Sequence, residues 1–185
     1  MAFVFQIGYH NIIIIMDTLE ENEIIVAVTG CVHGKIDKVY SLLNTIRSKL
    51  HIWPELVICT GDFEAHRDVY DLEGMNAPEH YMEIGNFHKY YRNEESAPYL
   101  TLVVGGNHEA CTYQWELFYG GWLCPNIYYL GECGSVYYRG LRIIGVSGID
   151  NPNEGSCLSA FICLCFYLLF SFRLYTLSPI CYAFP

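Results

Sequence analysis

Residues 98–109 read PYLTLVVGGNHE, and this stretch decides the fold. Its first seven residues are uncharged and rich in β-branched and aromatic side chains, so they predict a buried strand over 98–104. Two glycines end that strand, and the polar residues Asn107 and His108 follow them. In open α/β sheets ligands bind at this end of a strand, because the loops there are free of ladder hydrogen bonds. A polar turn that caps the next helix has the same composition and is the alternative.

Two earlier stretches have the same arrangement. Residues 24–29 (IIVAVT) and 56–60 (LVICT) are apolar, predict strands, and are each followed by glycine. The first leads to Cys31 and His33, and the second leads to Asp62. Because the carboxyl ends of parallel strands meet at one edge of a sheet, we expect these side chains to converge, with Asp62 in the middle.

The converging side chains indicate a metal site. We expect Cys31 and His33 to hold one ion and Asn107 to hold a second. The two carboxylate oxygens of Asp62 are then expected to bridge the ions. A pair of ions about 3.5–4 Å apart lowers the pKa of a bound water and clamps the attacking and leaving oxygens of a phosphoester. His108 is the expected proton donor to the leaving alkoxide.

The thiol of Cys31 bears on the identity of the metal. A thiolate is a softer ligand than a carboxylate, so it favours zinc or ferrous iron over magnesium. Cys31 and His33 also present two ligand types on one short loop. The alternative is that Cys31 is a small buried residue at a strand end.

The rest of the pattern predicts an α/β fold. Residues 35–50 have apolar side chains at helical spacing, which predicts the crossover helix of a βαβ unit. Residues 64–97 are mixed and polar, so we expect helical or loop structure over the site, with solvated histidines. Residues 137–146 predict a hairpin that starts a second sheet.

Several aromatic residues lie near this hairpin in the sequence, and most of them are expected in the core. Tyr119 and Trp122 are singled out as substrate neighbours, because aromatic rings stack on unpaired bases.

Charge and composition limit the kind of partner. The chain has 185 residues, of which 52% are hydrophobic and 16% charged, so it has ample material for a core. Its net charge is −10, with 10 Lys and Arg against 20 Asp and Glu. RNA-binding surfaces usually carry a basic patch, and the sequence shows none. The acidity therefore favours a metal-mediated grip on one phosphodiester over a long electrostatic groove.

The motifs resemble those of a known family. Gly-x-x-His-Gly, Gly-Asp and Gly-Asn-His-Glu, in this order, are the pattern of the calcineurin-like metallophosphoesterases. Within that family the chain resembles the RNA lariat debranching enzymes over about residues 23–149. The stretches that carry this second likeness are Cys31, GDFEA (61–65), GGNHEA (105–110), YGGWLCPNIYYLG (119–131) and RGLRIIGVSGI (139–149).

The resemblance implies a fold and an activity. The fold is a metallophosphoesterase-type β-sandwich flanked by helices (αββα), here cut short at its C-terminus. The activity is hydrolysis of the 2′,5′-phosphodiester branch of lariat intron RNA in the nucleus, by a monomer that binds neither DNA nor membrane. It implies one or two divalent ions, Fe²⁺, Zn²⁺ or Mn²⁺, and the metal ligands and catalytic residue already singled out.

The two ends of the chain differ from the middle. Residues 1–22 are expected to be an extension. Residues 1–15 are apolar but lack the basic region of a secretory signal, and the chain becomes polar directly after Met16, which is the expected natural start. Residues 23–149 are expected to be the N-terminal part of the metallophosphoesterase domain. Residues 150–185 form an apolar, cysteine-rich tail. The family has three further metal-binding histidines there, whereas none of the seven histidines of this chain lies beyond His108.

Three hypotheses about function stay open. The first is a debranching-type phosphodiesterase that is partial or inactive as this chain. The second is another metallophosphoesterase, for instance a protein phosphatase, although residues 66–68 (HRD) do not match the Asp-Arg-Gly of those enzymes. The third is a non-catalytic truncated product that is tethered to a membrane or binds metal weakly. The uncharged run 158–172 is shorter than the roughly 20 residues that a spanning helix needs.

Overall fold

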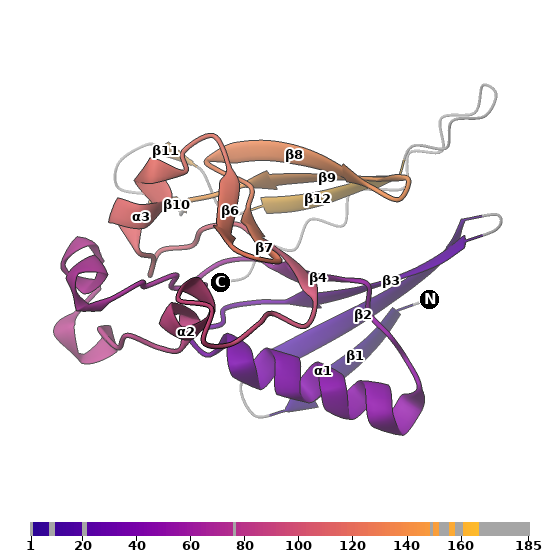
Figure 1. Ribbon diagram of the computed structural model, residues 1–185. Coiled ribbons are helices and arrows are strands. Elements are labelled where there is room, and N and C mark those ends of the chain that lie inside the picture. The colour runs from indigo at the N-terminus through magenta and orange to yellow at the C-terminus, as the bar shows by residue number, and fades with distance from the viewer. Residues whose placement is uncertain are drawn as a thin grey trace.

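A large mixed sheet lies between helices and a smaller sheet in the computed structural model (Figure 1). The structure describes residues 2–7, 10–19, 22–75, 77–148, 150–151, 156–157 and 161–166. The seven strands of the large sheet, in spatial order, are β1 (Ala2–Ile7), β2 (His10–Leu19), β3 (Asn22–Thr29), β4 (Leu56–Cys59), β5 (Leu100–Val103), β7 (Ile127–Tyr129) and β6 (Gly121–Cys124).

The centre of this sheet is parallel. Strands β3, β4, β5 and β7 run in the same direction, and β4 lies between β3 and β5. The three strands predicted from glycine-terminated apolar runs are therefore confirmed, and the strand that precedes Asp62 is the middle one. Strands β1, β2 and β6 are antiparallel to their neighbours and complete the two edges.

Helix α1 (Ile36–Leu50) is the predicted crossover between β3 and β4. Its apolar stripe includes Val39, Leu43 and Ile46, which are buried against the large sheet. Burying each such side chain contributes about 1.5–3 kcal/mol, so this stripe fixes the helix to the sheet. The helix ends at Leu50, and His51, its C-cap, takes a left-handed conformation.

The two faces of the large sheet belong to two different cores. On β4, Val57 and Cys59 pack with α1, whereas Leu56 and Ile58 pack with Leu141 of the smaller sheet. Successive side chains of a strand point to opposite faces, so a fully apolar strand is buried on both sides. This explains why β4 has no polar residue until the chain leaves the sheet.

The smaller sheet has the order β12-β9-β8, with β8 at Cys133–Tyr138, β9 at Leu141–Val146 and β12 at Phe161–Phe166. The predicted hairpin is confirmed, because β8 and β9 pair directly and turn at Arg139 and Gly140. Both turn residues have positive φ, 45° and 89°, which is the turn geometry that matches the twist of a hairpin. A separate two-stranded sheet pairs β10 (Asp150–Asn151) with β11 (Ser156–Cys157).

Short helices cover the edge of the large sheet where its parallel strands end. They are η1 (Val69–Gly74), η2 (Glu79–Tyr81), α2 (Phe87–Tyr91) and α3 (Cys111–Glu116). The first three fall within residues 64–97, where helical or loop structure was predicted. The expected α/β fold is thus confirmed, and the described residues supply its helix layer and both sheets. Within those residues, no helix is long and apolar enough to span a bilayer.

The N-terminal residues contribute to the sheet. Strand β2 pairs along the whole of β3, and β1 pairs with β2. Ile12 and Ile14 of β2 are buried in the core on the side of α1. The start of translation at Met16 stays a prediction. Most of the apolar tail over 150–185 lies outside the described residues.

Candidate metal centre

Three loops meet where the parallel strands end. The backbone N–H groups of Val32 and His33 donate to the carbonyl oxygen of Asp62 at 3.1 and 2.8 Å, which joins the loop after β3 to the loop after β4. The N–H of Val104 donates to the carbonyl oxygen of Cys59 at 3.1 Å, which brings the chain after β5 to the same edge. Backbone hydrogen bonds alone therefore join the three loops, independently of their side chains.

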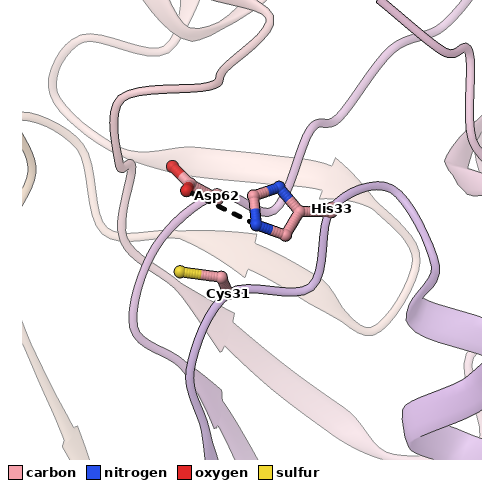
Figure 2. Close-up of side chains that lie close together, drawn as sticks. All are labelled: Cys31, His33 and Asp62. Carbon is pink, nitrogen blue, oxygen red and sulfur yellow. Dashed lines mark ion pairs between the residues drawn. The ribbon is translucent and has the colours of Figure 1, made fainter. Parts of the chain in front are cut away.

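Cys31, His33 and Asp62 form one cluster of potential ligands (Figure 2). One ligand atom from each residue lies within 4.8 Å of the others. Nε2 of His33 is 3.9 Å from Oδ2 of Asp62. A thiol sulfur, an imidazole nitrogen and a carboxylate oxygen are the donor types that zinc and iron prefer. The donor set fits a divalent transition metal, so the convergence predicted from sequence is found for these three residues.

The Asp62 carboxylate is held by the backbone of the third loop. Its Oδ1 accepts the N–H groups of Asn107 and His108 at 2.8 and 2.9 Å. A Cβ on Gly106 would overlap the same carboxylate, so only glycine allows this approach. Oδ2 is left to face His33. The bridging role expected for the two oxygens of Asp62 stays a prediction.

Asn107 and His108 lie beside Asp62 through these backbone contacts. Asn107 is exposed and His108 is half-buried. The imidazole rings of His108 and His33 are 5.7 Å apart between centroids. Nδ1 of His108 is buried and has no hydrogen-bond partner in the protein. The predicted proton donor therefore borders the cluster of ligands.

Glu109 ties the second and third loops together. Its Oε1 accepts the N–H groups of Phe63 and Gly106 at 2.9 Å each, and its Oε2 accepts the N–H of Glu64 at 3.0 Å. Burial raises the pKa of Glu109 to about 8, although these three backbone donors favour the ionised form. Sequence reasoning assigned no role to Glu109. Its position directly after His108 was the only signal for one.

Glu64 belongs to a second cluster with His33 and His108, in which one ligand atom of each lies within 4.8 Å of the others. Oε1 of Glu64 is 2.9 Å from Nδ1 of His33. Burial, and next the charge of Asp62, raise the pKa of Glu64 to about 8. This residue also lacked an assigned role in the sequence reasoning, because a buried glutamate looks the same in sequence as an exposed one.

Cys31 is exposed as a residue, but partial desolvation of its thiol, and next the negative charge of Asp62, raise the pKa of this thiol to about 11. The protein alone therefore keeps this residue as a thiol at neutral pH. A metal ion binds the thiolate, so binding must release this proton.

The aromatic residues divide between the site and the surface. Tyr119 is 93% exposed and packs on Phe118, and Trp122 is 57% exposed and packs on Tyr128. Tyr81 of η2 is the aromatic ring beside His108, with centroids 5.3 Å apart. Sequence reasoning did not single out Tyr81, and the roles given to Tyr119 and Trp122 stay predictions.

The histidines of residues 64–97 were expected to be solvated. His80 is exposed, as expected, and its ring packs on Tyr81 at 4.1 Å. For His66 the expectation is wrong, because this side chain is fully buried. Burial lowers the pKa of His66, so its imidazole is neutral near pH 7.

Comparison with known proteins identifies the class. The sequence profile of the calcineurin-like phosphoesterases matches residues 24–179. The chain therefore belongs to the calcineurin-like phosphoesterase family, whose members are hydrolases of phosphoester bonds that use metal ions.

The similar proteins within this class share one description. The lariat debranching enzymes of Gallus gallus and Homo sapiens are 49% and 50% identical to this chain over 129 residues, which are 70% of the chain. The lariat debranching enzyme of Arabidopsis thaliana is 44% identical over the same length. The matched part covers 24%, 24% and 31% of these three proteins. The chain thus spans about a quarter to a third of the length of the curated relatives it matches.

Proposed function

We propose that this chain carries the metal centre of a phosphodiesterase that hydrolyses the 2′,5′ branch of lariat intron RNA. The observation that carries the proposal is the convergence of Cys31, His33 and Asp62 on one point. The similarity to proteins described as lariat debranching enzymes supports the substrate. The proposal includes action in the nucleus, by a monomer that does not bind a membrane.

The metal would be held by Cys31, His33 and Asp62, with Asn107 as a neighbouring oxygen donor. The thiol favours Fe²⁺ or Zn²⁺, and Mn²⁺ is the third candidate, with one or two ions in the site. When bound, such an ion supplies Lewis-acid activation of the attacking water and stabilises charge on the phosphoryl oxygens. Asp62 contributes a carboxyl group in a fixed position, since it is buried and its Oδ1 accepts two backbone N–H groups.

His108 would donate the proton that the leaving 2′ oxygen needs. The backbone N–H of His108 donates to Oδ1 of Asp62, so the backbone fixes the position of this residue relative to the ligands. Its ring lies near those of Tyr81 and His33, with centroids 5.3 and 5.7 Å away. An imidazole that is held in this way is positioned to give a proton to the leaving oxygen.

RNA, and not DNA, would be the partner, because only RNA has the 2′ oxygen that forms the branch. Tyr81 would stack on a base next to the branch, since this residue is 52% exposed and its ring lies beside His108. Tyr119 and Trp122 would contact bases further from the branch. With a net charge of −10, the chain would depend on the ion for its hold on the phosphate.

The test is cleavage of a synthetic 2′,5′-branched RNA by the purified chain, supplied anaerobically with Fe²⁺ or Mn²⁺. A linear 3′,5′ RNA of the same sequence is the control substrate, and His108→Ala is the control variant. We expect cleavage of the branch alone, and its loss in the variant. Absence of cleavage by a folded, metal-loaded chain, or equal cleavage of linear RNA, would reject the proposal.

A further inference from the structure

The two ring nitrogens of His33 face different groups. Nε2 lies 3.9 Å from Oδ2 of Asp62, on the side of the ring that faces Cys31 (Figure 2). Nδ1 lies 2.9 Å from Oε1 of Glu64, which is hydrogen-bond distance. Nδ1 and Nε2 are separated by Cε1 and point outward from the ring in different directions, so Glu64 contacts the nitrogen that does not face Asp62.

A metal ligand must offer a lone pair, and a neutral imidazole has one on only one nitrogen. The other nitrogen carries the proton and needs an acceptor. If Nε2 binds the ion, then the proton is on Nδ1, and Oε1 of Glu64 is its acceptor. Partners of this kind fix the tautomer and orientation of metal-binding histidines.

We propose that Glu64 is a positioning residue that holds His33 in the Nδ1–H form, with Nε2 directed at the ion. This inference deepens the proposed function and rests on the metal centre it contains. It does not depend on the substrate being branched RNA.

Glu64 is suited to this role because it is fixed while His33 is not. The side chain of His33 is 46% exposed, whereas that of Glu64 is 4% exposed. The backbone of Glu64 has φ of 59°, a left-handed conformation that is unfavourable for a residue with a Cβ. Its N–H donates to Glu109, which holds it in that conformation. The imidazole is thus held by a group that cannot itself move freely.

Direct ligation of the ion by Glu64 is the competing explanation, since its carboxylate also lies near His108. The two explanations differ in which property of Glu64 matters. A positioning role needs a hydrogen-bond acceptor, which a glutamine supplies through its carbonyl oxygen. A ligand role needs the negative charge, which a glutamine lacks.

The experiment compares three variants of the full chain. Glu64→Gln keeps the acceptor, Glu64→Leu removes it, and Glu83→Leu removes a negative charge from an exposed residue that pairs with Lys35 and not with His33. Zinc is titrated into the metal-free protein by calorimetry. We expect Glu64→Leu to weaken zinc binding about 10- to 100-fold, as for other partners of metal-binding histidines. Glu64→Gln should weaken it less than about threefold, and Glu83→Leu should have no effect.

Nuclear magnetic resonance of the zinc-loaded chain gives a second readout. Long-range ¹H–¹⁵N spectra should show zinc on Nε2 of His33 and a slowly exchanging proton on Nδ1. That proton should exchange rapidly in Glu64→Leu. Thermal melting checks that each variant folds. If Glu64→Leu does not fold, the spectrum of the unsubstituted chain still shows which nitrogen of His33 binds zinc.

Several outcomes would overturn the inference. They are zinc bound to Nδ1, affinity unchanged in Glu64→Leu, or an equal loss in Glu64→Gln and Glu64→Leu. The last would assign Glu64 as a ligand. Failure of the proposed function is distinct, because it would appear as zinc binding that depends on Glu64 without cleavage of branched RNA.

Discussion

The loop after β3 and the loop after β4 face each other across the metal centre, and they differ in burial. Cys31 and His33 on the first loop are exposed, whereas Asp62 and Glu64 on the second are buried. The second loop also has positive φ at both Asp62 and Glu64, and Glu109 holds it by two N–H groups. The comparison indicates a division of work: the buried loop fixes the geometry and supplies Asp62 as a ligand, and the exposed loop supplies Cys31 and His33.

The largest expected effect comes from breaking the buried side at Asp62. In Asp62→Asn, the amide oxygen can still accept the N–H groups of Asn107 and His108, so the fold should persist. The charge that faces His33 is lost, so zinc binding should fall by more than about 100-fold, beyond the loss seen for residues that only support a ligand. Calorimetry and thermal melting measure the two quantities. Loss of folding with zinc binding retained in the remaining folded protein would contradict the division.

The next effect is on stability, through Glu109. Glu109→Gln replaces Oε2, which accepts the N–H of Glu64, by a donor, so this N–H and the new amide group are buried without acceptors. We expect a loss of about 3 kcal/mol, because buried donors are left without acceptors. This corresponds to a fall in melting temperature of roughly 6–12 °C for a domain of this size. Glu116→Gln, at an exposed glutamate, is the matched control, and an equal fall in both variants would argue against the role of Glu109.

On the exposed side, pH should matter through Cys31. Since burial and Asp62 raise the pKa of this thiol to about 11, zinc must displace its proton at neutral pH. Raising the pH removes that competition, so zinc affinity should increase by about tenfold per pH unit from this residue alone. In Cys31→Ala the dependence on pH should be weaker by that amount. Calorimetry at pH 6.5 and 7.5 measures it, and an unchanged slope in the variant would show that Cys31 is not a ligand.

The smallest effect concerns the substrate and not the ion. Tyr81→Ala should raise KM for branched RNA about tenfold with little change in kcat, since stacking on one base contributes about 1–3 kcal/mol. Tyr81→Phe keeps the ring and should behave like the unsubstituted chain. Tyr119→Ala and Trp122→Ala test the two aromatic residues expected from sequence, and we expect smaller effects because neither packs on His108. Steady-state kinetics would contradict this order if Tyr119→Ala had the larger effect.

The ligand side chains are the part of the site that sequence could predict. Each of Cys31, Asp62 and Asn107 follows an apolar run and a glycine, so strand, loop and polar side chain are all visible locally. Parallel strands then bring the loops together by a general rule of such sheets. The expected convergence of the loops placed Asp62, and therefore β4, in the middle. Apolar residues at helical spacing predicted α1 as the crossover.

The supporting contacts around the ligands join residues that are far apart in the chain. Glu64 and Glu109 are 45 residues apart and meet only when β4 and β5 pair. His66 was expected in solvent because it lies in a polar segment, and such a segment does not show in sequence which of its side chains turns inward. The position of Tyr81 is set by a loop whose next turn is held by a bond from the N–H of Asn86 to the carbonyl oxygen of Gly34.

The central claim is that Cys31, His33 and Asp62 hold one ion, and X-ray absorption spectroscopy of the zinc-loaded chain tests it most directly. We expect one sulfur neighbour at about 2.3 Å from zinc, with nitrogen and oxygen neighbours at about 2.0–2.2 Å. In Cys31→Ala the sulfur neighbour should disappear while the nitrogen and oxygen neighbours remain. A zinc spectrum without sulfur in the unsubstituted chain, or one that Cys31→Ala leaves unchanged, would contradict the account.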